Sequence, residues 1–230
     1  MQKDYYQNIL YPLQNRVLKL MEQLPVDFYL TGGTALSRAY LNHRYSDDLD
    51  FFVNGSDKFK SQVDTIVKSL TGIKLKPGII QADEEFVRMN IREEQIMLKI
   101  DFVNDVPFRQ EAPVRTDLYT FTDTPLNILT NKVTALPRLE ARDVADIVFI
   151  SLKYSFNWTA VISGAAEKDM RVNPPETARI LDEFPVERLT VLNWIDQAPD
   201  PQWFGSRLRI IIQDILQGNS NTLYREESIV

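Results

Sequence analysis

Residues 28–53 read FYLTGGTALSRAYLNHRYSDDLDFFV, and this stretch decides the fold. A short aromatic and apolar run at its start breaks at Gly32 and Gly33, where the chain must turn from a strand into a helix. We expect Thr34 to cap that helix, because apolar residues recur behind it at helical spacing up to about Asn42. Backbone N–H groups at a helix N-terminus attract anions. The turn therefore predicts a binding site for a phosphate.

The end of the same stretch predicts a pair of carboxylates that bind a metal. Side chains alternate faces along a strand, so Asp48 and Asp50 share one face while Leu49, Phe51 and Val53 share the other. Neighbouring carboxylates repel unless a cation lies between them, and hard oxygen ligands suit Mg²⁺ when substrate phosphates complete the octahedron. A phosphate-binding turn followed by such a pair indicates nucleotide chemistry with Mg²⁺ as cofactor.

These residues carry a family resemblance. The order Gly32-Gly33-Thr34 and then, 12 residues after Thr34, Ser46-x-Asp48-x-Asp50 resembles the nucleotidyltransferase motif of the polymerase-β-like superfamily. More narrowly, LTGGTALSRAYLNHRYSDDLDFF and NKVTALPRLEARDVADIVFI resemble the AbiEii/AbiGii toxin family. That family is the enzyme half of type IV toxin–antitoxin and abortive-infection pairs. The resemblance covers roughly residues 28–54 and 125–150.

The resemblance implies an activity and a set of site residues. The expected reaction moves NMP from an NTP to an acceptor hydroxyl with Mg²⁺, a tRNA 3′ end is the leading acceptor, and a cognate antitoxin is the expected partner. Asp48, Asp50 and Asp101 would hold the metal. A Lys and an Asp of the helical region would complete the catalytic set, which the resemblance places at Lys132 and Asp146, with Asp143 as the alternate to Asp146. The expected substrate-binding residues are Gly32, Gly33, Thr34, Arg44, Ser46 and Lys132.

Asp101 is placed by the alternation of its own strand. In QIMLKIDFV, residues 95–103, Ile100 and Phe102 share the apolar face while Lys99 and Asp101 share the other. In polymerase-β-like enzymes a third carboxylate on a neighbouring strand faces the first two, and Asp101 resembles that residue. A polar residue near the end of a sheet is the structural alternative.

Other charged residues also have structural alternatives. Arg44 could pair with Asp47 or Asp50 instead of a phosphate, and Asp146 could form an exposed helix ion pair with Arg142. His43, the single histidine, is expected to be a surface or hydrogen-bonding residue rather than a catalytic one.

The remaining periodicity predicts an α+β fold, with a nucleotidyltransferase-like mixed β-sheet core, flanking helices and an all-helical C-terminal region. Residues 1–123 form the expected core, with a boundary at the helix start Thr124-Pro125. Residues 124–218 form the helical region that completes the active site, and residues 219–230 form a loose polar tail. We expect helices at 4–23, 34–42 and 57–70, hairpin strands at 73–80, 85–91 and 95–103, and one short strand at 118–121.

Composition limits the classes of function. The 230-residue chain contains no cysteine and has a formal net charge of −6, so it is not an electrostatic DNA binder as a whole, and an RNA acceptor must meet a local basic patch. The sequence shows no leader and no long apolar run, which predicts a cytoplasmic protein with no membrane partner. Three alternatives stay open: a protein or small-molecule acceptor, a nucleotide-binding module without turnover, and an interaction protein that keeps only the fold.

Overall fold

The structure, a computed structural model, describes residues 2–93 and 96–224. The chain forms two compact units. The first contains the chain up to residue 40 together with 45–107 and 112–123, and the second contains 41–44, 108–111 and the chain from 124 onward. Two short segments, 41–44 and 108–111, therefore belong to the second unit although the chain around them belongs to the first.

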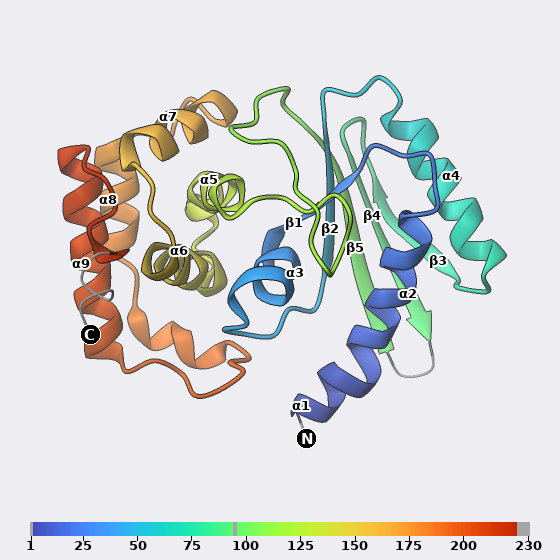
Figure 1. Cartoon of the computed structure of the whole chain (residues 1–230), viewed down its shortest axis with the longest axis horizontal. Coiled ribbons are helices and arrows are strands. Elements are labelled where there is room, and N and C mark those ends of the chain that lie inside the picture. Colours follow the sequence, from blue (N-terminus) through green and yellow to red (C-terminus); the bar gives the residue numbers. More distant parts are fainter. Residues whose placement is uncertain (1, 94–95, 225–230) are drawn as a thin grey trace. The chain divides into compact units, whose positions relative to one another are not determined.

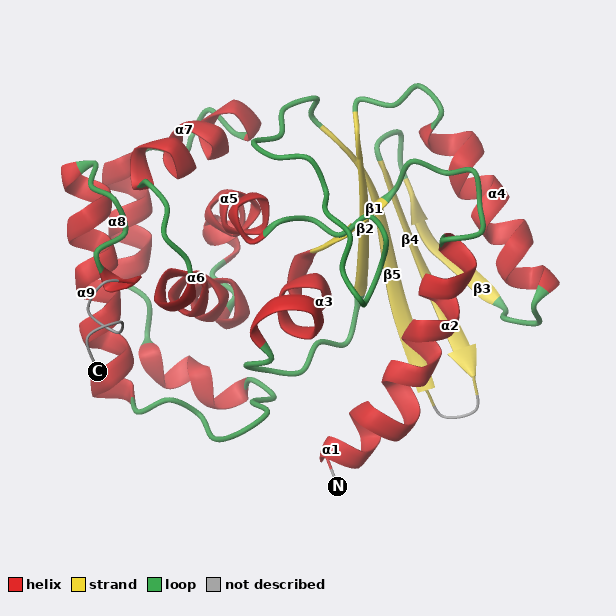
Figure 2. Cartoon of the chain, in the orientation of Figure 1, coloured by secondary structure: helices red, strands yellow, loops and turns green. Residues whose placement is uncertain are grey.

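A five-stranded mixed sheet forms the centre of the first unit (Figure 2). The spatial order is β1-β2-β5-β4-β3. Strands β2 and β5 run parallel, and the other neighbours pair antiparallel. The strands are β1 (Tyr29–Thr31), β2 (Leu49–Asn54), β3 (Pro77–Ala82), β4 (Phe86–Glu93) and β5 (Ile96–Asp105). This mixed sheet and its helices confirm the expected α+β class.

One face of this sheet is the core of the first unit. Along β2 the burial alternates residue by residue, and Leu49 and Phe51 are fully buried. The Phe51 and Phe102 rings stack with centroids 5.5 Å apart, and Phe28 meets Phe102 edge-on at 5.1 Å. The opposite face of β2 and β5 is left for polar side chains, as the sequence pattern predicts.

Helices cover the apolar face and lead into the strands. The helix expected over 4–23 forms as three successive segments, the middle one a π-helical turn, and α2 packs against α4 (Figure 1). The helices of this unit are α1 (Gln2–Tyr5), η1 (Tyr6–Leu10), α2 (Tyr11–Met21), α3 (Gly32–Ala35), η2 (Leu36–Leu41) and α4 (Phe59–Gly72). The assignment of η2 includes Leu41, with which the second unit begins.

Two local predictions in this unit are wrong. The helix after β1 starts at Gly32, so Thr31 is its N-cap and Thr34 lies inside the first turn rather than capping it. Gly32 has a φ of +70°, which lets the chain turn into the helix directly after Thr31, whose side chain makes no capping hydrogen bond. The expected strand at 118–121 is absent, and Thr122 instead forms isolated bridges with Leu30 and Val114.

The second unit consists of helices, and the first of them starts at the predicted cap. The Thr124 side chain accepts from the Asn127 N–H at 3.3 Å, and Asn173 and Asp200 cap their helices in the same way. Gly218, with a φ of +66°, ends the last helix. The elements are α5 (Pro125–Ala135), η3 (Leu136–Arg138), α6 (Ala141–Lys153), α7 (Trp158–Lys168), α8 (Pro174–Asp182), η4 (Val186–Val191) and α9 (Pro201–Gln217).

The expected loose tail is wrong for residues 219–224. Asn221 is buried and its amide donates to the carbonyls of Ser151 and Tyr154 at 2.6 and 2.8 Å. Leu223 is fully buried. The polar composition of this segment does not predict packing against the helical unit. The packing arises because the polar Asn221 side chain binds backbone carbonyls of that unit. Residues 225–230 lie outside the described residues.

Over the part of the chain that the structure describes, no helix combines the length and the apolar character needed to cross a bilayer.

Candidate active site

Three carboxylates lie on the polar face of the sheet. Asp50 of β2 and Asp101 of β5 are direct partners in the parallel register, so their side chains leave the same face of adjacent strands. Asp48 lies two residues before Asp50, immediately before β2. The side chains of Asp48 and Asp101 are 19% and 10% exposed, so ligands in solvent reach them.

The glycine turn lies against this group. A Cβ atom on Gly32 would come within 2.2 Å of the Asp50 carboxylate, so only glycine fits there. The Thr34 hydroxyl donates to the Asp48 carbonyl and so ties the first helical turn to the chain that enters β2. The backbone N–H groups of Gly33 and Thr34 lie in that first turn, as the sequence predicts.

The N-terminal helix holds the residues just before the carboxylates. The buried Gln14 amide donates to the carbonyls of Ser46 and Asp47 at 3.2 and 3.1 Å. The Tyr6 hydroxyl donates to the Asp47 carboxylate at 2.6 Å. Asp47 is therefore turned toward the N-terminal helix, and Ser46 contributes its backbone to the positioning of Asp48.

Two cations that the sequence did not reveal as site residues contact the carboxylates. Lys99 Nζ lies 2.6 Å from an Asp48 oxygen, and Arg88 donates to both Asp101 oxygens at 2.8 Å. The hydrogen bonds to Asp101, reinforced by the charges of Asp101, Asp48 and Asp50, raise the pKa of Arg88 above its ordinary value. Strand alternation predicts that Lys99 lies on the same face as Asp101. The position of Arg88 opposite Asp101 follows only from the pairing register of β4 and β5, which the sequence alone does not give.

The donor chemistry at this face fits Mg²⁺. Carboxylate oxygens are its preferred protein ligands, and this face offers three carboxylates. Within residues 2–93 and 96–224, no three His, Cys, Asp or Glu side chains are arranged to hold a metal together. Asp48, Asp50 and Asp101 are the residues that would hold the ion.

A second charged group lies buried in the helical unit. Arg44 binds Asp146 with two hydrogen bonds of 2.8 and 2.7 Å, and His43 Nε2 lies 2.9 Å from the same carboxylate. Lys132 Nζ lies 2.8 Å from Asp146 and 2.7 Å from Asp143. We call these five residues the buried ion network.

Burial and charge act against each other in this network. Burial alone would raise the pKa of Asp146, but Arg44 and Lys132 outweigh it and hold that pKa well below the ordinary value. For His43, desolvation dominates over the attraction of Asp146, and its pKa is lowered. The network therefore holds an ionised Asp146 with cations around it.

The predicted site residues form two sets, one in each unit. Those of the first unit share the sheet face and its turn, while Lys132 and Asp146 share the buried ion network, with the alternate Asp143 in it as well. Arg44 pairs with Asp146, whereas Asp47 and Asp50 were the carboxylate partners considered from the sequence. Asp146 is 0% exposed, so the alternative of an exposed helix pair with Arg142 is wrong. Which of these residues act on substrate stays a prediction.

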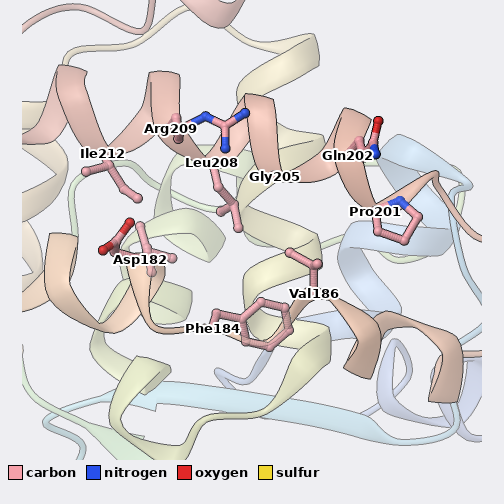
Figure 3. Close-up of a pocket in the computed structure, with 10 residues that line it drawn as sticks. Asp182, Phe184, Val186, Pro201, Gln202, Gly205, Leu208, Arg209 and Ile212 are labelled. Carbon is pink, nitrogen blue, oxygen red and sulfur yellow. The ribbon is translucent and has the colours of Figure 1, made fainter.

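A groove of about 440 Å³ between α8 and α9 contains none of these residues (Figure 3). Its lining is largely apolar, with Asp182 and Arg209 as its charged side chains.

Comparison with known proteins places the chain. The family described as "Nucleotidyl transferase AbiEii toxin, Type IV TA system" matches residues 19–201. The chain belongs to the AbiEii family. It is a nucleotidyltransferase of a type IV toxin family by that membership, and the match spans both the carboxylate face and the buried ion network. No curated protein shows a significant match to the sequence.

Solved structures show the same fold. The AbiEii-family chain is similar to JHP933 from Helicobacter pylori, with a TM-score of 0.61 and 21% identity over 96% of this chain and 94% of that one. It is also similar to a proposed nucleotidyltransferase from H. pylori, with a TM-score of 0.60 and 20% identity over 95% of each chain. At these identities the likeness describes the fold.

Proposed function

We propose that the protein transfers a nucleoside monophosphate from an NTP to an acceptor hydroxyl, with Mg²⁺ held by Asp48, Asp50 and Asp101. The observation that carries this proposal is the register of Asp50 beside Asp101 on adjacent parallel strands, with Asp48 paired to Lys99 on the same face. Three carboxylates at one point of a sheet would repel one another without cations. Nucleotidyl transfer uses such a group because it must neutralise a triphosphate and position an attacking hydroxyl.

The residues of the first unit have separate roles in this reaction. The bound cation supplies charge neutralisation for the triphosphate. Asp101 orients the acceptor hydroxyl and takes its proton, the hydroxyl oxygen bonds to the α-phosphorus, and pyrophosphate leaves. Gly33 and Thr34 offer backbone N–H groups to phosphate oxygens. Gly32 allows the close approach of the turn to Asp50.

From the second unit we propose Lys132 and Arg44 as phosphate-binding cations, with Asp146 as their acidic partner. The pKa of Lys132 is raised, because Asp146 and Asp143 outweigh the effect of burial, so the ammonium is charged. Supporting this role, both cations lie in the region that matches the AbiEii family.

The acceptor we propose is a tRNA 3′ end, and the proposed partner is a cognate antitoxin. The description of the family as toxins of type IV systems supports the antitoxin partner. The tRNA acceptor rests on the family resemblance of the site residues alone. NTPs and tRNA are cytoplasmic, so the proposal places the protein in that compartment. A protein or a small molecule is the alternative acceptor, since a net charge of −6 does not favour RNA.

A nucleotide-binding module without turnover is the second candidate function. The observation that favours it is the pairing of Asp48 with Lys99 and of Asp101 with Arg88, which occupies two of the three carboxylates. If those pairs persist when nucleotide is present, the carboxylates do not reach a metal.

The test incubates the protein with each radiolabelled NTP, Mg²⁺ and total RNA, followed by a gel that resolves RNA and protein. We expect label on small RNA with the wild type, and a loss of at least about a hundredfold with Asp48→Ala because the metal site is removed. Asp47→Asn is the matched control, because its carboxylate contacts Tyr6 instead.

Each outcome of this assay decides between the candidates. Label on protein would move the acceptor assignment from RNA to protein. Nucleotide binding without label in any lane would favour the module, and undiminished labelling by the Asp48→Ala variant would reject the assigned metal site.

A further inference from the structure

Two cations of the chain lie where substrate charges are expected. Lys99 and Arg88 come from adjacent strands β5 and β4, and the register places both on the face that holds the carboxylates. Their side chains are 28% and 37% exposed. A bound phosphate could therefore reach both cations without any opening of the core.

The same atoms cannot serve a divalent cation and Lys99 together. The Lys99 ammonium lies 2.6 Å from an Asp48 oxygen, so a metal ion bound to that oxygen would be placed beside a like charge. Arg88 takes both oxygens of Asp101 in a bidentate geometry, which leaves that carboxylate little capacity for another ligand. Binding of a metal by these carboxylates requires the two cations to leave.

We infer that Lys99 and Arg88 exchange partners when substrate binds. They leave Asp48 and Asp101 and bind the phosphates of the NTP, while the carboxylates take the divalent cation. This inference deepens the proposed function and rests on it. Every charge keeps a partner of opposite sign through the exchange, so neither the carboxylates nor the two cations become isolated charges.

The exchange makes metal binding and nucleotide binding depend on each other. Metal alone must compete with Lys99 for Asp48, and nucleotide alone must compete with two carboxylates for Lys99 and Arg88. When both ligands bind, the nucleotide draws Lys99 away from Asp48, and the metal draws the carboxylates away from Lys99 and Arg88. Coupling of this kind is reciprocal, and a factor of about 5–150 is typical.

If the two ion pairs had a purely structural role, their removal would not change the coupling between metal binding and nucleotide binding. Ion pairs that are partly exposed contribute little to stability, and a static pair would leave the coupling between metal and nucleotide unchanged when it is removed.

Arg92 is the matched control. It lies on β4 four residues beyond Arg88 and on the same face, and within the described residues it forms no hydrogen bond or ion pair with a carboxylate.

The experiment measures both ligands separately and together. Mn²⁺ binding without nucleotide is followed by electron paramagnetic resonance, and binding of each of the four α,β-methylene NTP analogues is followed by calorimetry with and without Mn²⁺. The variants are Lys99→Met, Arg88→Gln and the control Arg92→Gln. Circular dichroism checks the fold, and Lys99→Gln replaces Lys99→Met if that variant unfolds.

The expected result is a change of opposite sign in the two affinities. For Lys99→Met we expect Mn²⁺ alone to bind about fivefold more tightly, and the analogue with Mn²⁺ to bind about tenfold more weakly, within the usual range of coupling factors. For Arg88→Gln we expect the coupling factor to fall by a similar amount. Arg92→Gln should match the wild type in all three measurements.

The experiment distinguishes failure of the partner exchange from failure of the proposed function. If the wild type binds Mn²⁺ and an analogue together but Lys99→Met and Arg88→Gln keep its coupling factor, the exchange is overturned and the proposed function stands. If the wild type binds neither Mn²⁺ nor any analogue, the proposed function is overturned and the exchange with it.

Discussion

Asp146 is a carboxylate with no exposure to solvent, and Arg44, Lys132 and His43 lie within hydrogen-bond distance of it. Moving ions out of water costs several kcal/mol each, and only complete pairing offsets that cost. The residues of this network therefore depend on one another, because removal of one member leaves the others buried without compensation.

Asp146→Asn tests this dependence. We expect the free energy of unfolding to fall by about 3–5 kcal/mol, because Arg44 and Lys132 would share a site with too little negative charge. Urea unfolding followed by circular dichroism gives the value. Asp169→Asn is the control, since Asp169 pairs with Arg171 at the surface and its loss should leave the midpoint unchanged. A midpoint for Asp146→Asn equal to that of the control would contradict the dependence of the buried cations on Asp146.

His43 is the single histidine, so one residue accounts for the histidine contribution to the pH dependence of stability. Its pKa is lowered from 6.5 by burial, against the pull of Asp146, while Arg44 and Lys132 lower it further. Below pH 6.5 the unfolded chain binds a proton that the folded chain does not bind. The free energy of unfolding should therefore fall as the pH drops from about 7 toward the lowered pKa, by at most about 1.4 kcal/mol per pH unit.

Urea titrations between pH 7.5 and about 5.5 measure this slope. The variant His43→Gln lacks the titrating ring, so its stability should be lower at pH 7 but nearly independent of pH over that range. An equal slope in the variant and the wild type would assign the pH dependence to other groups.

At the scale of elements, the N-terminal helix acts through a single buried amide. Gln14 on α2 is 0% exposed, donates to the carbonyls of Ser46 and Asp47, and accepts from Arg38 at 2.9 Å. These bonds fix the turn from which Asp48 enters the carboxylate group. The helix therefore supports the site although it supplies no charge to it.

Gln14→Met should cost about 1–3 kcal/mol of stability, because two buried carbonyls lose their donor. Nucleotidyl transfer should also weaken, through the position of Asp48 rather than through its charge. Unfolding curves and the transfer assay measure the two effects. The control is Asn15→Ala, at an exposed neighbour that also accepts from Arg38. Full activity of Gln14→Met would show that the turn holds its position without the helix.

Local sequence predicted those elements whose causes are local. The predicted cap at Thr124 follows from a side chain next to the bond that it makes. The alternation in β2 showed which carboxylates share a face. The sequence could not show that Arg88 faces Asp101, because this contact depends on the register between two strands. Nor could it show that Arg44 meets Asp146, because 102 residues separate them.

At the scale of the whole molecule, the chain crosses between units more often than a single boundary implies. The expected division at residue 123 separates the sheet from the helices, but residues 41–44 belong to the helical unit. That short segment contributes His43 and Arg44 to the network around Asp146. A cut at residue 123 would therefore remove two partners of a buried carboxylate.

The fragment 124–230 tests this interleaving. We expect it to lack a cooperative unfolding transition, because Asp146 would lose Arg44 and His43, and breaking a buried pair costs about 3–5 kcal/mol. The same fragment with Asp146→Leu should regain structure, since Lys132 keeps Asp143 at 2.7 Å and the buried position becomes apolar. Urea unfolding by circular dichroism compares both fragments with the full chain. A parent fragment that unfolds cooperatively at the midpoint of the full chain would show that the helical unit does not need residues 41–44.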